Sequence, residues 1–155
     1  MRNIYRHKKF IAWLLVFIWM SFIFYLSHQS GFESSRLSSG FMDKILTVFT
    51  WLFHSHINVN NFHFIIRKVA HFFAYFILGM LVVHALFKEN NKKKEIIAAL
   101  FICIMYAITD EIHQSFIPGR SGEIRDVLID SCGAVIGIGL YIIGRPLLLR
   151  QIKSK

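Results

Sequence analysis

The chain has 155 residues, enough for one domain, and more than half of them are apolar. A soluble protein of this size cannot bury so much apolar surface, and the mean hydropathy is positive, so the composition favours a membrane protein. The net charge of +9 does not indicate a nucleic-acid partner, because the basic residues fall in short clusters between long apolar runs. Cys103 and Cys132 lie within apolar runs, and we interpret them as small buried hydrophobic residues rather than a disulfide pair.

Four apolar segments are long enough to cross a bilayer: Phe10–Leu26, Ile65–Phe87, Ile96–Ile112 and Val127–Ile143. We interpret the first as an uncleaved helix, because it is longer than a usual signal-peptide core and no small-x-small cleavage site follows it. The sequence therefore predicts an all-α fold, a four-helix transmembrane bundle that forms a single domain over residues 1–155.

Basic residues predict the orientation of this bundle. Four Lys or Arg residues lie before the first span, four between the second and third, and four after the last, out of eighteen in all. With four spans, these three stretches lie on the same side of the membrane. The net charge of that side is about +10, and the net charge of the other side is about −1. We therefore expect a multi-pass protein with both termini in the cytoplasm.

The long connection between the first two spans contains an amphipathic stretch, Phe41–Phe53. Its apolar residues recur at helical spacing, and polar residues line the opposite face. The pattern predicts a short helix. It either lies in the outer membrane interface or packs over the bundle, and the sequence leaves both arrangements open.

Ionisable residues gather near the outer ends of the last three spans. With about 1.5 Å of rise per residue, His71, Asp110 and Asp130 lie about 22–25 Å above the inner boundaries of their helices. That level is close to the outer edge of a hydrocarbon core about 30 Å thick. Residues four apart share a helix face, so Arg67 with His71, and Asp126 with Asp130, form polar stripes that should turn away from lipid.

These residues predict a site. The candidates for proton transfer and its orientation are His71, Asp110, Glu111, His113 and Asp126. The candidates for holding a substrate are Arg67, Lys68, Gln114, Arg120 and Asp130. Arg120 follows the turn-forming pair Pro118-Gly119, which can fold it back over the cluster, whereas Glu111 points about 100° around the helix from Asp110. The alternative, that these groups only satisfy one another inside the bundle, stays open.

The same acids and histidines are also suitable ligands for a divalent metal. However, Asp-x-x-His, as in Asp110 and His113, is a weak metal signal, and no thiolate accompanies it. We therefore assign no metal, and the cofactor is unknown. Gly133 and Gly137 are four residues apart, a spacing of small residues that allows two helices to pack closely. We expect them to pack within the bundle, with a homo-oligomer through this pair as the secondary interpretation.

Four motifs at the outer ends of the spans carry a further signal: Phe24–Gly31, Arg67–Tyr75, Thr109–Arg120 and Asp126–Gly133. Together they resemble the VanZ-like family of small membrane proteins. The block Asp-Glu-x-His-Gln followed by Pro-Gly-Arg is the specific part of the match. One departure is Ala74, where family members often carry an acid before the tyrosine of the second helix.

The family is named for a protein linked to resistance against the glycopeptide antibiotic teicoplanin. The resemblance implies a bacterial cell-envelope protein in the plasma membrane. It favours a contribution to teicoplanin-type resistance through an outer-facing polar pocket that binds an anionic membrane lipid or a lipid-linked cell-wall precursor. The alternative is a membrane-embedded hydrolase or transferase acting on a lipid headgroup or phosphate. Transport ranks last, because the inner halves of the spans are almost wholly apolar.

Overall fold

The structure, a computed structural model, describes residues 2–29, 51, 59–87 and 92–153. Its helices are α1 (Arg2–His28), α3 (Val59–Leu86), α4 (Lys92–Gln114) and α5 (Ile124–Lys153), and the described residues contain no strand. Each helix contains a candidate membrane span, over Arg6–His28, Ile65–Leu86, Lys92–Gln114 and Ile124–Pro146. The predicted all-α fold with four transmembrane helices is confirmed. Of the predicted amphipathic helix Phe41–Phe53, only Trp51 lies among the described residues, so that helix stays a prediction.

The helices extend beyond the apolar segments from which they were predicted. α4 begins at Lys92 rather than Ile96, because lysine and glutamate are good helix formers and Glu95 in the first turn complements the positive end of the helix dipole. α5 likewise continues through Pro146 to Lys153. Hydropathy marks where a helix can contact lipid, whereas the helix itself continues into its charged flanks.

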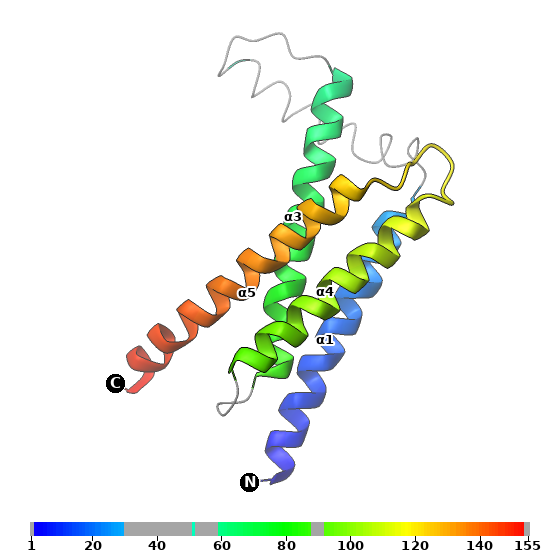
Figure 1. The fold of residues 1–155 in the computed structure, drawn as a ribbon. Helices are drawn as coiled ribbons and strands as arrows, with labels where there is room; N and C mark the ends of the chain where they lie inside the picture. Colours follow the sequence, from blue (N-terminus) through cyan, green and yellow to red (C-terminus); the bar gives the residue numbers. More distant parts are fainter. Residues whose placement is uncertain (1, 30–50, 52–58, 88–91, 154–155) are drawn as a thin grey trace.

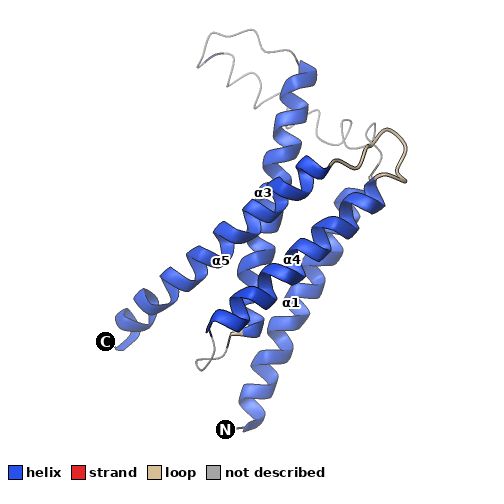
Figure 2. Ribbon diagram, viewed as in Figure 1, coloured by secondary structure: helices blue, strands red, loops and turns tan. Residues whose placement is uncertain are grey.

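The chain brings both of its ends to one end of the bundle. The first turn of α1 and the last turn of α5 lie there, together with the end of α3 and the start of α4 (Figure 1). At the opposite end, α1 and α4 finish and α5 begins, and the loop of residues 115–123 joins α4 to α5 (Figure 2). We call this opposite end, with the adjacent turns of α3 around His71, the polar end.

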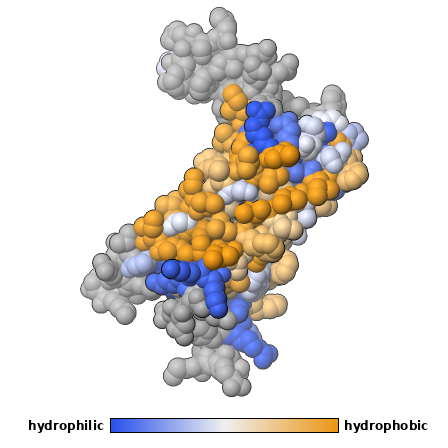
Figure 3. Space-filling view, viewed as in Figure 1, coloured by the Kyte–Doolittle hydropathy of each residue, from blue (hydrophilic) through white to orange (hydrophobic). Residues whose placement is uncertain are grey.

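An apolar surface separates the two ends. Large hydrophobic side chains are exposed along all four helices, among them Phe17, Phe73, Phe101 and Leu140. On the face shown in Figure 3, hydrophobic residues form a broad band with hydrophilic residues above and below it. Such a band is unstable in water and suits the hydrocarbon core of a bilayer, so the surface agrees with a multi-pass membrane protein.

α3 and α5 form the most extensive helix contact, and glycine makes their close approach possible. A Cβ atom at Gly133 would overlap the carbonyl oxygen of Phe72, and one at Gly137 would overlap that of Phe76. The spacing of these glycines is therefore used inside the bundle, as the preferred interpretation of the sequence expects.

Side-chain hydrogen bonds to backbone carbonyls hold α1 against its neighbours. Trp19 Nε1 donates to the Ala74 carbonyl on α3 over 2.9 Å, and the Tyr106 hydroxyl of α4 donates to the Met20 carbonyl over 2.6 Å. Polar groups in hydrocarbon gain most when they find a partner in the protein, so these bonds help to fix the positions of the helices.

Both cysteines are free, so the expectation that they form no disulfide is confirmed. The expected burial is confirmed for Cys103 and wrong for Cys132. Cys103 is buried against the core, whereas Cys132 is exposed on the surface of α5. Cys132 is adjacent to Gly133, which faces α3, and the rotation of about 100° per residue carries its neighbour to the outside.

Candidate functional site

Asp110 anchors the polar end on α4. Buried residues recur along this helix at helical spacing, and Asp110, Glu111 and Gln114 are the last of them toward the polar end. Asp110 Oδ2 accepts a hydrogen bond from the Ser27 hydroxyl of α1 over 2.8 Å and another from Gln114 Nε2 over 3.1 Å. Its second oxygen, Oδ1, is buried and has no hydrogen-bond partner among the described residues. The carboxylate is thus held in place by one oxygen while the other points into the protein.

His71 and Asp130 meet between α3 and α5. Asp130 is fully buried, and its Oδ2 lies 3.6 Å from His71 Nδ1. Neither Asp130 oxygen has a hydrogen-bond partner within the described part of the chain, and the same holds for His71 Nδ1. The fully buried Tyr75 hydroxyl is also unpartnered there, and it interacts electrostatically with both Asp110 and Asp130.

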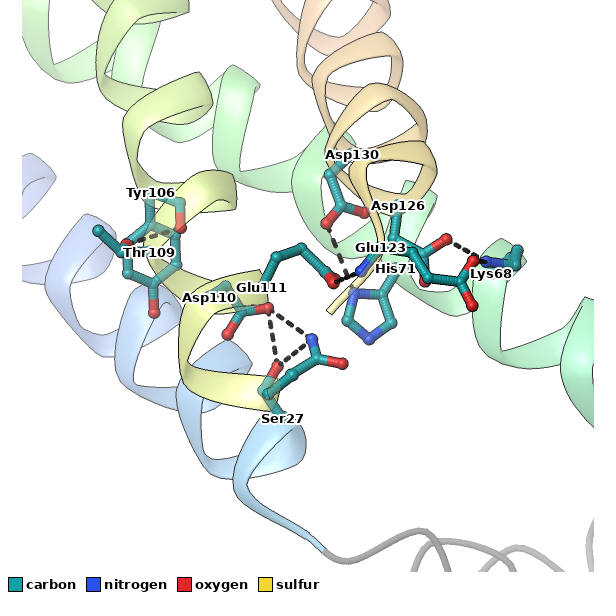
Figure 4. A network of polar contacts seen from close by, with 11 residues as sticks. Ser27, Lys68, His71, Tyr106, Thr109, Asp110, Glu111, Glu123, Asp126 and Asp130 are labelled. Carbon is teal, nitrogen blue, oxygen red and sulfur yellow. Dashed lines mark hydrogen bonds and ion pairs between the residues drawn. The ribbon is translucent and has the colours of Figure 1, made fainter. Parts of the chain in front are cut away.

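Three helices therefore deliver side chains to one point. One ligating atom each of His71, Asp110 and Asp130 lies within 4.8 Å of the other two. The close-up shows these side chains directed toward a common space from α3, α4 and α5 (Figure 4). We call His71, Asp110 and Asp130 the central triad. The equal depth inferred from the sequence agrees with this convergence.

Glu111 is buried beside the triad, although helical phase made it the least secure candidate. Its Oε2 accepts a hydrogen bond from the backbone N–H of Glu123 over 2.9 Å. The loop before α5 folds back onto α4 at this point, and a Cβ atom at Gly122 would lie 2.6 Å from the Glu111 carbonyl oxygen. Glu111 thus accepts a hydrogen bond from a backbone N–H at the start of α5, and this bond joins the loop to the residues around the triad.

Lys68 and Asp126 form a separate ion pair on the α3–α5 side. The Lys68 ammonium bonds to the Asp126 carboxylate and lies 3.5 Å from Glu123 Oε2. The side chains of Lys68 and Asp126 are mostly buried, with 13% and 14% of their surfaces exposed. Asp126 therefore contacts the Lys68 ammonium rather than His71 of the triad.

Arg120 returns to the bundle through a tight turn. Gly119 has φ 76°, a left-handed conformation that favours glycine, and the Arg120 N–H donates to the Ile117 carbonyl over 3.1 Å. Its Nη2 then donates to the Leu26 carbonyl at the end of α1 over 3.2 Å. Burial lowers the pKa of Arg120 and nearby Arg67 lowers it further, while Asp110 and Glu111 act in the opposite direction. The turn therefore brings the Arg120 guanidinium within range of both Arg67 and the acids.

His113 lies on the α1 side of the polar end. Its Nε2 is 3.2 Å from His28 Nδ1, and its ring stacks on Phe24 with a centroid separation of 4.4 Å. It is still within electrostatic range of Asp110, but its ring pairs with α1 rather than with the triad. The ten predicted residues thus lie at the polar end, but they form several neighbouring groups of contacts rather than the lining of a single pocket.

Ser27, Tyr75 and Glu123 contribute to these groups and were not among the predicted site residues. Ser27 lies in the first family-like motif, and Tyr75 continues the stripe of Arg67 and His71 by another four residues, so both had a signal in the sequence. Glu123 had none, because its role depends on the path of the loop.

The fold and the polar end define a multi-pass membrane protein with a buried cluster of ionisable residues near one end of its spans. The chain belongs to the VanZ/LLP1 family, whose model matches residues 11–147 and so includes every predicted site residue.

A curated relative supports the same class. Over 80 residues the chain is 35% identical to a Bacillus subtilis (strain 168) protein named "Uncharacterized membrane protein YwnJ". The match covers 52% of this chain and 51% of that protein, so it spans about half the length of the relative. No solved structure matches the chain.

Proposed function

We propose that this protein contributes to teicoplanin-type glycopeptide resistance in a bacterial plasma membrane by binding an anionic group at its polar end. The anionic group belongs to a membrane lipid or a lipid-linked cell-wall precursor. In this proposal the polar end faces the outside and both termini lie in the cytoplasm. Membership of the VanZ/LLP1 family and the distribution of basic residues support the setting and the orientation.

The Arg120 guanidinium carries the proposal for an anionic ligand. Its Nε and Nη1 atoms are buried and have no hydrogen-bond partner among the residues that the structure describes. Buried donors on a charged group are costly when unpaired, and hydrogen bonds to charged groups are worth about 1.5–3 kcal/mol. Nε and Nη1 lie on different edges of the planar guanidinium, and N–H donors on either edge match the oxygens of a phosphate or carboxylate.

Arg67 adds a second positive charge to the same place. It lies close enough to Arg120 to act on its pKa, so the two guanidiniums repel each other. An anion between them would offset that repulsion, in the same direction as Asp110 and Glu111. The cations thus favour a phosphate-bearing headgroup, with the acids beneath it.

A hydrolase or transferase is the second candidate, and the central triad favours it. His71 paired with Asp130 has the arrangement of a general base oriented by a carboxylate, and Asp110 is a second acid on the opposite helix. Under this alternative, the anionic headgroup held by Arg67 and Arg120 is cleaved or transferred rather than only bound.

Binding is tested with purified protein in detergent by native mass spectrometry. The lipids are phosphatidylglycerol, a polyisoprenyl pyrophosphate and, as the neutral control, phosphatidylcholine. Arg120→Ala should weaken binding of the preferred anionic lipid by about 10-fold or more, as the loss of a charge-assisted bond predicts. Arg125→Ala is the matched control, because Arg125 lies in the same region with 70% of its side chain exposed.

The two anionic lipids distinguish a general headgroup from a wall precursor. Equal affinity of all three lipids, or equal weakening by Arg120→Ala and Arg125→Ala, would contradict the proposal. Conversion of the anionic lipid into a new mass would support the hydrolase or transferase.

A further inference from the structure

The central triad holds several polar atoms that are fully buried and unsatisfied. Asp130 is 0% exposed and Asp110 2% exposed, and together they present three carboxylate oxygens without a hydrogen-bond partner among the described residues. His71 Nδ1 and the Tyr75 hydroxyl, which is also fully buried, add two more such atoms in the same region. Of these five atoms, His71 Nδ1 and Asp130 Oδ2 lie 3.6 Å apart, which is longer than a hydrogen bond. A buried polar atom normally has a partner, so five such atoms in one region indicate a missing ligand.

We infer that His71, Asp110 and Asp130 bind one divalent metal ion of the Zn²⁺ or Mn²⁺ type. One imidazole nitrogen with carboxylate oxygens is a ligand set that such ions accept. This inference goes beyond the proposed function and does not depend on the lipid that the polar end binds.

The distances suit a metal ion with small side-chain movements. Ligands about 2.1 Å from a tetrahedral ion lie about 3.4 Å from each other. His71 Nδ1 and Asp130 Oδ2 are already 3.6 Å apart, and the whole set lies within 4.8 Å. The upper limit of 4.8 Å exceeds 3.4 Å by about 1.4 Å, a difference that side-chain rotations can supply.

The surroundings of Asp110 fit a metal ligand. Ser27 and Gln114 bond to Oδ2, which fixes the carboxylate, while Oδ1 is buried and has no hydrogen-bond partner among the described residues. Ligating carboxylates and histidines are commonly oriented by such hydrogen bonds from neighbouring residues. The Tyr75 hydroxyl, an oxygen donor near both carboxylates, is available as a further ligand or as a hydrogen-bond donor to one.

The negative charges of Asp110 and Asp130 also favour a bound cation. Two carboxylates within 4.8 Å of each other inside a membrane-spanning bundle repel unless a cation or protons compensate them. Lys68 is engaged by Asp126 and Glu123, and Arg120 acts on Asp110 from the loop before α5. A divalent ion compensates both carboxylates at once and takes its third ligand from neutral His71. The competing explanation is that the acids are protonated and need no ion.

The test is the metal content of the purified protein. The protein is stripped with a chelator in detergent, loaded separately with Zn²⁺ or Mn²⁺, desalted and analysed by elemental mass spectrometry, without added lipid. We expect about one ion per chain for at least one of the two metals. Asp130→Asn and His71→Ala should each lose most of that metal. The control is Glu95→Gln, which removes another buried acid of α4 close to its first turn and should retain the metal.

A second measurement tests ligation directly if Asp130→Asn or His71→Ala does not fold. Co²⁺ is loaded into the wild type and into His71→Cys. Direct ligation predicts a new thiolate-to-Co²⁺ absorption band in the variant, which a merely structural histidine would not give. Less than about one-tenth of an ion in the loaded wild type, metal retained by Asp130→Asn, or no new band in His71→Cys would overturn the site. Lipid binding in metal-free protein would leave the proposed function standing, so the two claims fail separately.

Discussion

Asp130 of α5 and His71 of α3 face each other across the most extensive helix contact in the bundle, with Oδ2 and Nδ1 3.6 Å apart. The contact is close because Gly133, three residues after Asp130, packs on the carbonyl of Phe72, the residue next to His71. The geometry of the polar pair therefore depends directly on the small residues beside it.

Enlarging Gly133 should separate α3 from α5. Gly133→Ala places a methyl group against the Phe72 carbonyl, and overpacking of this kind costs about 1–3 kcal/mol. We expect a lower midpoint of thermal unfolding in detergent. Gly139→Ala is the control, because nothing lies within 4 Å of a Cβ at that position. Equal midpoints for the two variants would show that the glycine contact is not tight.

Removing the charge of Lys68 should destabilise the polar end. Lys68→Met leaves mostly buried Asp126 without this cation, and breaking a buried pair costs about 3 kcal/mol. The matched control, Arg125→Met, removes an exposed partner of Glu123, for which we expect less than about 1 kcal/mol. Thermal unfolding of both variants gives the comparison. A Lys68 variant as stable as the Arg125 variant would mean that the pair adds nothing to stability.

The conformation of Gly119 should control the position of Arg120. In Gly119→Ala the left-handed backbone costs about 1–2 kcal/mol, so the turn should relax and withdraw the guanidinium from Leu26. We expect weaker binding of the anionic lipid, in the direction of Arg120→Ala. Binding by Gly119→Ala at the wild-type level would show that the turn does not position the arginine.

Cysteine labelling tests the proposed orientation. Position 93 at the start of α4 and position 121 in the loop before α5 are both exposed and lie at opposite ends of the bundle. In protein without Cys103 and Cys132, a membrane-impermeant reagent on intact cells should label Ser121→Cys and leave Lys93→Cys unmodified. The reverse pattern would place the polar end in the cytoplasm.

Depth and helical phase predicted the composition of the polar end but not its pairings. His71, Asp110 and Asp130 converge because residues at one level on polar stripes must turn away from lipid. Which stripe faces which helix depends on how each helix is rotated and packed. Sequence spacing does not specify that rotation, so the pairing of His113 with His28 and of Asp126 with Lys68 was not foreseen.

The hydroxyl of Ser27 illustrates a second limit. It ends an apolar run and looks like an ordinary boundary residue, yet it donates the shorter of the two hydrogen bonds to Asp110 Oδ2. Its role arises only because α1 packs beside α4. The four spans, by contrast, followed from composition alone, because hydrocarbon leaves few other structures for such runs.

The central claim is that the polar end is a functional site and not only a structural network. The most direct test is Asp110→Asn, which keeps the size of the side chain and its bond to the Ser27 hydroxyl but removes the charge. Teicoplanin tolerance is measured in a strain whose tolerance depends on this protein, together with the amount of protein in the membrane and its thermal stability in detergent. Glu95→Gln is the control. We predict that Asp110→Asn lowers tolerance to the level without the protein, at near wild-type amount and stability, while Glu95→Gln keeps it. A folded Asp110→Asn with full tolerance would contradict the site, and a variant that fails to fold would show that the network is structural.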